Sequence, residues 1–230
     1  MTDTAPMTRK LLCLHGNRSN AQVTEMQCQG ILELDKVAEL HYLDAPFENT
    51  AFDKDIGPGR SWFLRDGPSE AAQEDLRRSL LHVVEHIALH GPFEGCYGFS
   101  QGAAITSLLC EPVVYGALGL TSPPFRFVML VCGANYDTAF GAGVAQEFIG
   151  ACASREGASQ SSLLQLPSLH FMGEKDDMLE SSRALAQRFV QPQLLVHKSG
   201  HTLPAAELCV GAGLQLSSRL RSFIEGPGYP

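Results

Sequence analysis

The chain has 230 residues, of which 44% are hydrophobic and 18% are charged, as is usual for a globular protein. Its 17 basic and 25 acidic residues give a net charge of −8 without a Lys/Arg cluster, which argues against nucleic acid or an anionic membrane as a partner. No apolar run approaches the ~20 residues that cross a bilayer, and the first residues contain no signal-peptide core, so we predict a cytoplasmic protein without membrane insertion.

Short β-prone runs alternate with helical patterns in the first half of the chain. The pattern predicts strands at Lys10–Leu14 and Glu39–Leu43, with a helix between them from Arg18 to Leu34. Residues 47–68 are rich in Gly, Pro and Asp and are predicted to form a loop. An amphipathic helix is expected from Ser69 to His90.

The same alternation continues in the second half. A short strand at Gly95–Phe99 is followed by a helix at Gln101–Cys110, and the uninterrupted apolar run Phe127–Cys132 is typical of a central parallel strand buried on both faces. Further strands are expected at Ser168–Met172 and Leu194–His197, and further helices at Ser181–Phe189 and Leu203–Ile224.

Strands that alternate with helices throughout the chain predict an α/β fold, a doubly wound, mainly parallel sheet flanked by helices. We expect one domain over residues 10–225, with flexible ends at 1–9 and 226–230. Residues 133–167 are small, polar and poorly periodic, and are expected to form either a small cap over a cleft or a disordered excursion. Sheets of this kind carry their chemistry on loops at the carboxyl ends of the strands.

The seven cysteines are odd in number, and none of them forms a C-x-x-C pair. Most of them lie in apolar stretches. We interpret them as small buried thiols in a reducing compartment, and predict neither a zinc site nor a disulfide framework.

The sequence Gly98-Phe99-Ser100-Gln101-Gly102 matches the G-x-S-x-G pattern, in which a strand reverses sharply into a helix and holds a serine on the bend. A chance match is possible in a chain with 22 glycines. The apolar strand before the motif and the apolar helix after it favour Ser100 as a nucleophile, with the Gln101 amide donating to an oxyanion.

A serine hydroxyl needs a base, which in this arrangement follows the serine in the chain, after an acid. Three histidines lie downstream of Ser100. His170 lies inside a strand pattern and is interpreted as a packed core residue. His201 lies on the loop after the last strand and is the predicted base, with His197 as a weaker second candidate.

The acid is expected at the end of the preceding strand, where three acidic residues lie close together. Its task is to accept the imidazole N–H and stabilise the imidazolium. Glu174 adjoins the turn glycine and is expected to point sideways. Spacing alone does not separate Asp176 from Asp177, and at least one of the three is expected to be a solvated turn residue.

A second oxyanion donor normally comes from the loop after an early strand. Here Gly16 permits a close approach of the backbone, and the Asn17 amide is the predicted donor. His15 is interpreted as a structural or cleft-lining residue rather than as a second base.

Five segments together resemble the FSH family of serine hydrolases, which have the α/β-hydrolase fold. They are LLCLHGNRSN, GRSWF, YGFSQGAAI, SLHFMGEKDDM and HKSGHTLP, and they keep the family's order from about Lys10 to Pro204. By position, the resemblance implies Ser100 as nucleophile and His201 as base. The family pattern G-[DE]-x-D implies Asp176 rather than Asp177 as the acid, although the proline that often follows is absent here.

The resemblance also implies an activity, the cleavage of acyl esters by a carboxylesterase through an acyl-serine, with a small-molecule substrate and no metal or other cofactor. Trp62, in the Arg60-Ser61-Trp62 segment, is expected near the cleft with His15 and Gly16, either in contact with substrate or as a packing anchor. The alternatives are a thioesterase that releases acyl or polyketide chains from a carrier, a non-catalytic binding module and a peptidase.

Overall fold

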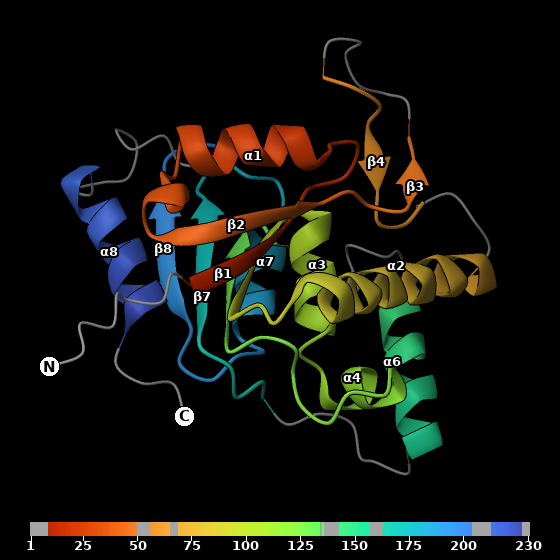
Figure 1. The fold of residues 1–230 in the computed structure, drawn as a ribbon. Coiled ribbons are helices and arrows are strands. Elements are labelled where there is room, and N and C mark those ends of the chain that lie inside the picture. The colour runs from red at the N-terminus through yellow and green to blue at the C-terminus, as the bar shows by residue number, and fades with distance from the viewer. Residues whose placement is uncertain are drawn as a thin grey trace, which may run out of the picture.

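The computed structural model describes residues 9–49, 56–64, 69–133, 135, 143–156, 163–203 and 213–226. Six strands, all paired in parallel, form a central sheet (Figure 1). Across the sheet the strands follow the order β2 (Ala38–Leu43), β1 (Arg9–Leu14), β5 (Gly95–Phe99), β6 (Phe127–Val131), β7 (Ser168–Gly173) and β8 (Gln193–His197).

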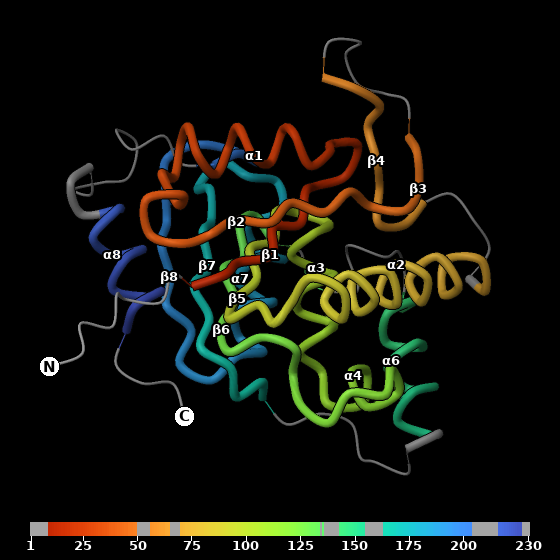
Figure 2. The backbone as a smooth tube through the Cα atoms, in the orientation of Figure 1, coloured from red at the N-terminus to blue at the C-terminus, as the bar shows by residue number. Residues whose placement is uncertain are grey.

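Helices cover both faces of this sheet, as the α/β pattern of the sequence predicts. Helices α1 (Ala21–Gly30) and α8 (Gly213–Glu225) pack with one core cluster. The opposite core cluster takes its helical side chains from α2 (Ser69–His90), α3 (Gln101–Leu108), α4 (Pro112–Ala117), α6 (Val144–Glu156) and α7 (Leu179–Ala186). Figure 2 traces how these helices surround the strands.

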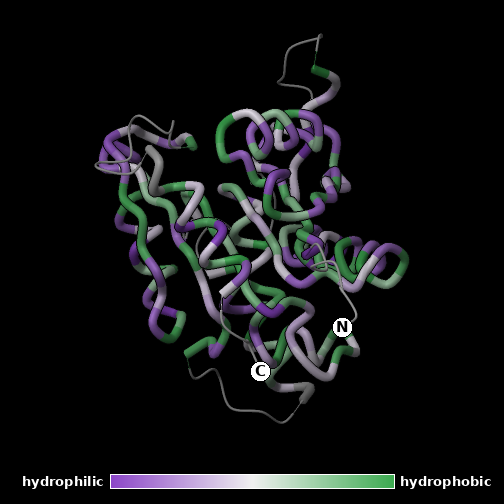
Figure 3. The backbone as a smooth tube through the Cα atoms, turned by 60° about the vertical axis from the view of Figure 1, so that its left-hand side comes forward, coloured by the Kyte–Doolittle hydropathy of each residue, from purple (hydrophilic) through white to green (hydrophobic). Residues whose placement is uncertain are grey.

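The two cores follow from the alternation of side chains along each strand. In β1, Leu11 and Cys13 contribute to the α1–α8 core, whereas Leu12 and Leu14 contribute to the opposite one. All five residues of β6 are buried, as the continuous apolar run predicts for a strand covered on both faces. Figure 3 shows that much of the sheet is hydrophobic. The carboxyl ends of the strands therefore belong to a sheet that is covered by a core on both faces.

The predicted loop 47–68 contains two short strands that the sequence pattern does not predict. Strands β3 (Phe47–Glu48) and β4 (Arg60–Ser61) pair in an antiparallel way, and Phe47 lies opposite Ser61. Each has only two residues, which is too short to give a period-2 signal. Residues 50–55 and 65–68 lie outside the described residues.

Helices α1, α4 and α6 also differ from the sequence prediction. The helix expected from Arg18 to Leu34 is shorter, and a 3₁₀ turn η1 (Leu34–Lys36) follows it. Pro112, which ends the predicted helix before it, begins α4, since proline suits the first turn of a helix. Residues 144–156 form α6, which packs against α4 and α2. Of the helix predicted from Leu203 to Ile224, the structure describes α8 from Gly213 onward, and residues 204–212 lie outside the described residues.

None of the helices that the structure describes is long and apolar enough to cross a membrane. Six cysteines within the described residues are buried and carry free thiols, as their apolar surroundings in the sequence predict. Cys209 lies outside the described residues.

Candidate active site

Ser100 lies on a sharp bend between β5 and α3. Its φ of 52° and ψ of −110° place a non-glycine residue in the left-handed region, which is costly and is typical of a functional turn. The Ser100 amide donates to the carbonyl of Val131 at 2.9 Å, which ties the bend to the end of β6. The backbone therefore holds the hydroxyl at the carboxyl edge of the sheet, as the G-x-S-x-G pattern predicts.

The two outer glycines of the motif permit this bend. A Cβ atom at Gly98 would meet the backbone of Ala103 in the following helix. A Cβ atom at Gly102 would meet the carbonyl oxygens of Leu14 and His15 at the end of β1. Only residues without a side chain allow α3 to lie this close to the sheet.

His201 reaches Ser100 from the loop after β8. Its Nε2 atom lies 3.0 Å from Ser100 Oγ, although the two residues are 101 positions apart in the chain. The ring packs against Phe99, with 5.3 Å between the ring centroids. The side chain is 39% exposed, so solvent and substrate can reach it. His201, and not His197, is therefore the imidazole in contact with the serine.

Asp176 supports His201 from the loop after β7. Its Oδ2 atom lies 2.9 Å from His201 Nδ1, and its Oδ1 atom accepts a hydrogen bond from the Met178 amide at 2.8 Å. The Asp176 side chain is 1% exposed, whereas Glu174 and Asp177 are exposed. With its proton on Nδ1 toward Asp176, the imidazole presents Nε2 as an acceptor for the Ser100 hydroxyl.

The other two downstream histidines are buried. His170 contacts the Ser168 hydroxyl through Nε2 at 3.0 Å, and burial lowers the pKa of His170 to about 3. His197 accepts a hydrogen bond from the Ser199 amide at Nδ1, and burial lowers its pKa below the ordinary value. The interpretation of His170 as a core residue thus agrees with the structure.

Two amide N–H groups beside Ser100 are free to donate. In the described part of the chain, neither the Asn17 nor the Gln101 amide has a protein hydrogen-bond acceptor. Asn17 follows β1, and Gln101 is the first residue of α3. Gly16 is packed so closely that a Cβ atom there would meet the Phe99 ring. Free N–H groups next to a nucleophile can stabilise a developing oxyanion.

His15 and Trp62 are fully buried, which does not support the expectation that they contact substrate. His15 donates from Nδ1 to the Gly16 carbonyl at 2.7 Å and accepts at Nε2 from the Ala45 amide at 2.9 Å. Burial lowers the pKa of His15 to about 4, so the ring is neutral at pH 7. Trp62 donates from Nε1 to the His15 carbonyl at 2.8 Å. Both side chains support the loop after β1 from within.

The segment around Trp62 also holds both candidate oxyanion donors. The Gln101 side chain accepts from the Trp62 amide at 3.0 Å and donates to the Phe63 carbonyl at 3.2 Å. The Ser61 hydroxyl donates to Asn17 Oδ1 at 2.7 Å. The resemblance points to this segment, but sequence alone gives no signal that its contacts join Asn17 to Gln101.

Cys132, which the sequence pattern indicates only as a buried thiol, lies against the loops that carry Asp176 and His201. It follows β6 with a φ of 47°, and its Sγ atom lies 3.5 Å from the Thr202 carbonyl oxygen. Burial and the neighbouring Asp176 carboxylate raise the pKa of the Cys132 thiol to about 12. Only the three-dimensional arrangement of the strand ends brings this thiol to Asp176 and His201.

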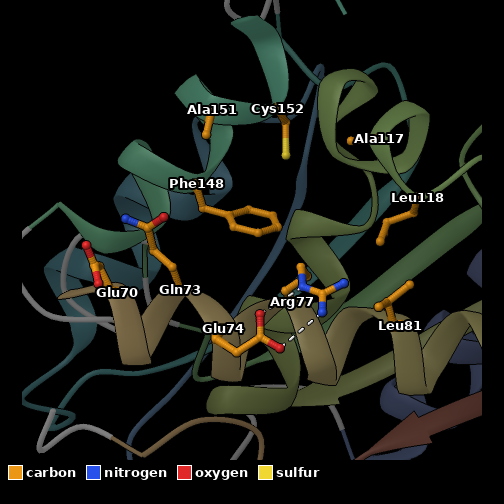
Figure 4. Close-up of a pocket in the computed structure, with 10 residues that line it drawn as sticks. All are labelled: Glu70, Gln73, Glu74, Arg77, Leu81, Ala117, Leu118, Phe148, Ala151 and Cys152. Atoms are coloured by element: carbon orange, nitrogen blue, oxygen red, sulfur yellow. Dashed lines mark hydrogen bonds and ion pairs between the residues drawn. The ribbon is translucent and has the colours of Figure 1, made fainter. Parts of the chain in front are cut away.

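A cavity of about 360 Å³ lies elsewhere, between α2, α4 and α6 (Figure 4). Phe148 projects into it from α6, and the ion pair between Glu74 and Arg77 lies along α2. None of the residues that line this cavity belongs to the Ser100–His201–Asp176 group.

Sequence comparison finds relatives over most of the chain. A family model described as "Serine hydrolase (FSH1)" matches residues 4–212. The chain is 28% identical to "Esterase OVCA2" of Danio rerio over 229 residues, which cover 86% of this chain and 91% of that protein. It is 28% identical to "Esterase FPY3" of Fusarium mangiferae over 205 residues, which cover 85% of this chain and 88% of that protein.

Solved structures share the fold at low sequence identity. A carboxylesterase from Mesorhizobium loti is 15% identical, with a TM-score of 0.57, and the match covers 95% of this chain and 89% of that one. The acyl-protein thioesterase 2 of Zea mays is 18% identical, with a TM-score of 0.56 and coverage of 96% and 97%. These neighbours identify the six-stranded sheet and its helices as an α/β-hydrolase fold.

Proposed function

Because this chain belongs to the FSH1 serine hydrolase family, we propose that it is a carboxylesterase that cleaves small acyl esters through an acyl-serine intermediate. The observation that carries the proposal is the pair of hydrogen-bond contacts that join Ser100, His201 and Asp176, at 3.0 and 2.9 Å. A serine, an imidazole and a buried carboxylate in this order can generate a nucleophile at neutral pH.

In the first half of the proposed reaction, Ser100 Oγ bonds to the carbonyl carbon of the ester while its proton passes to His201 Nε2. The Asp176 carboxylate stabilises the imidazolium that forms. The bond to the leaving alkoxide then breaks, and His201 returns the proton to that oxygen. The products of this half are the free alcohol and an acyl group on Ser100.

In the second half, water replaces the hydroxyl of Ser100 as the nucleophile. His201 removes a proton from the water as its oxygen bonds to the acyl carbon, and then protonates Ser100 Oγ as the acyl bond breaks. The carboxylic acid leaves, and the hydroxyl is restored. No metal or organic cofactor takes part in the proposed reaction.

The Asn17 and Gln101 amides are the proposed oxyanion donors in both halves. Their free N–H groups support this role, and each is expected to lower the barrier by about 3 kcal/mol. His15 and Trp62 are proposed to position the loop that carries the Asn17 amide. The neutral imidazole and the indole each donate a hydrogen bond to a carbonyl group of this loop after β1.

The Ser100→Ala variant tests the proposal. We expect turnover of p-nitrophenyl esters to fall by about 10⁴-fold or more, because the remaining groups cannot form an acyl intermediate. Labelling by a fluorophosphonate probe should disappear, and circular dichroism should show an unchanged fold. Unchanged turnover in this variant would exclude the proposed mechanism.

The same assay shows whether the chain prefers carboxylesters or thioesters, since the proposed triad can cleave both. Paired oxygen esters and thioesters of equal acyl chain should be compared by kcat/KM, with Ser100→Ala as the background. Faster cleavage of the oxygen esters is expected. A preference for the thioesters would reassign the chain as a thioesterase, and probe labelling without any turnover would favour a binding module.

We also propose a cytoplasmic location. The free thiols of the six described cysteines support it, because reducing compartments keep thiols unpaired.

A further inference from the structure

Three different metal-ligating side chains meet at the carboxyl ends of β6, β7 and β8. The Cys132 thiol, the Asp176 carboxylate and the His201 imidazole each offer one ligand atom, and these atoms all lie within 4.8 Å of one another. Among the residues that the structure describes, this is the one place where three such side chains gather. We propose that Cys132, Asp176 and His201 form a binding site for Zn²⁺, and that the bound ion switches the hydrolase off reversibly.

The ligand set indicates the class of ion. Thiolate, imidazole and carboxylate are the ligands that Zn²⁺ uses in proteins, at about 2.0–2.3 Å and in tetrahedral geometry. Ligand atoms in such a site are about 3–4 Å apart, so the group has to open only slightly around the 2.9 Å contact between Asp176 Oδ2 and His201 Nδ1. Mg²⁺ and Ca²⁺ prefer oxygen ligands and suit a thiol poorly.

Charge is balanced when the ion binds. Without metal, the three side chains hold one negative charge on Asp176, a thiol on Cys132 and a neutral imidazole with its proton on Nδ1. Zn²⁺ bonds to Sγ, to a carboxylate oxygen and to Nδ1. The thiol proton leaves to solvent, the ring proton moves to Nε2, and the site becomes neutral overall.

The position of the group allows entry from one side. Cys132 and Asp176 are buried, whereas the His201 side chain is 39% exposed. An ion can therefore reach the group past His201, and water can take the fourth position of the tetrahedron there.

Inhibition follows from the proton on Nε2. A ring that is bonded to metal through Nδ1 and protonated at Nε2 has no acceptor for the Ser100 proton. This consequence for turnover rests on the proposed esterase function, but the metal site itself does not.

The first test measures ester hydrolysis against the concentration of free Zn²⁺, with Mg²⁺ as a comparison. We expect Zn²⁺ to inhibit, Mg²⁺ to leave the rate unchanged, and excess EDTA to restore the rate. In Cys132→Ser, compared with its own metal-free rate, the inhibition constant should rise at least about tenfold because a thiolate ligand is lost. The matched control is Cys110→Ser, another buried thiol, whose hydrogen bond to the Thr106 carbonyl a serine can replace, and here inhibition should remain.

The second test needs no turnover. Co²⁺ replaces Zn²⁺ in such sites, and a cobalt–thiolate bond gives a charge-transfer absorption band. We expect this band in the Ser100→Ala chain, and its loss when Cys132→Ser is added but not when Cys110→Ser is added.

The two tests separate the possible failures. If the Co²⁺ band depends on Cys132 but the wild-type chain has no esterase activity, the metal site would be supported and the proposed function contradicted. Equal inhibition of wild type and Cys132→Ser, without a Cys132-dependent band, would overturn the three-ligand site. The absence of both inhibition and band would overturn it as well.

Discussion

Asp176 and Asp177 are adjacent in the chain but have opposite surroundings. Asp176 is buried and lies against His201, whereas Asp177 is exposed. We expect Asp176→Asn to lower kcat by about 10³–10⁴-fold, because the amide no longer stabilises the imidazolium or fixes its tautomer. Asp177→Asn should change kcat by about twofold or less. Steady-state kinetics with one p-nitrophenyl ester would compare the two variants, and a larger loss at Asp177 would contradict the assignment of the acid.

At the scale of residues, the sequence predicts Ser100 and His201 of the candidate site, but it does not predict which neighbouring side chains contact them. The motif around Ser100 and the loop position of His201 carry a local signal, which the structure agrees with by joining the two side chains. Spacing cannot distinguish Asp176 from Asp177, because their burial depends on how the turn folds. Cys132 gives no signal either, since its contact with Asp176 joins residues that are 44 positions apart and is set by strand order.

At the scale of elements, the Gln101 side chain joins α3 to the segment after β4. Its amide group satisfies the Trp62 N–H and the Phe63 carbonyl, and both residues are buried. Gln101→Met keeps most of the volume but removes the acceptor of the buried Trp62 N–H and the amide donor to the Phe63 carbonyl. We expect the free energy of unfolding to fall by about 2–4 kcal/mol, and kcat/KM to fall as well because the Gln101 amide loses its support.

Ser107→Ala is the matched control on the same helix. The Ser107 hydroxyl donates only to the Ala103 and Ala104 carbonyls, which lie within α3 and keep their helical partners. Its removal should cost about 1 kcal/mol or less. Urea denaturation followed by circular dichroism would measure both variants, and similar losses at Gln101 and Ser107 would show that the side-chain link has little effect.

The elements that the sequence predicts are those with a strong periodic or apolar signal. The bounds of β5 and α2 agree with the prediction, since an apolar run and a long amphipathic pattern define them. Strands β3 and β4 have two residues each, and α4 has six, so none of them is long enough to show a period. Helix α6 carries small and mixed side chains, and its helical form depends on packing against α2 and α4.

Over the whole molecule, buried neutral histidines link stability to pH, and the pKa values of His15 and His170 are lowered furthest. Burial lowers the pKa of His15 to about 4 and that of His170 to about 3, whereas an unfolded histidine has a pKa of about 6.5. Because the folded chain takes up these protons less readily, the stabilisation is fully present above pH 6.5. It is lost as pH falls from 6.5 toward 4 for His15 and toward 3 for His170, by about 2 kcal/mol each at pH 5.

The His170→Gln variant isolates one of these contributions, because His170 does not belong to the Ser100–His201–Asp176 group and Gln can keep a hydrogen bond to Ser168. The difference in unfolding free energy between wild type and variant should shrink by about 2 kcal/mol between pH 7.5 and pH 5. Below pH 6.5 the His170 ring takes up a proton when the wild type unfolds, which favours the unfolded chain, and the variant has no such ring at this position. Urea denaturation at a series of pH values measures this difference directly. A constant difference across the range would mean that His170 takes up its proton equally well in the folded chain, and that acid sensitivity arises elsewhere in the molecule.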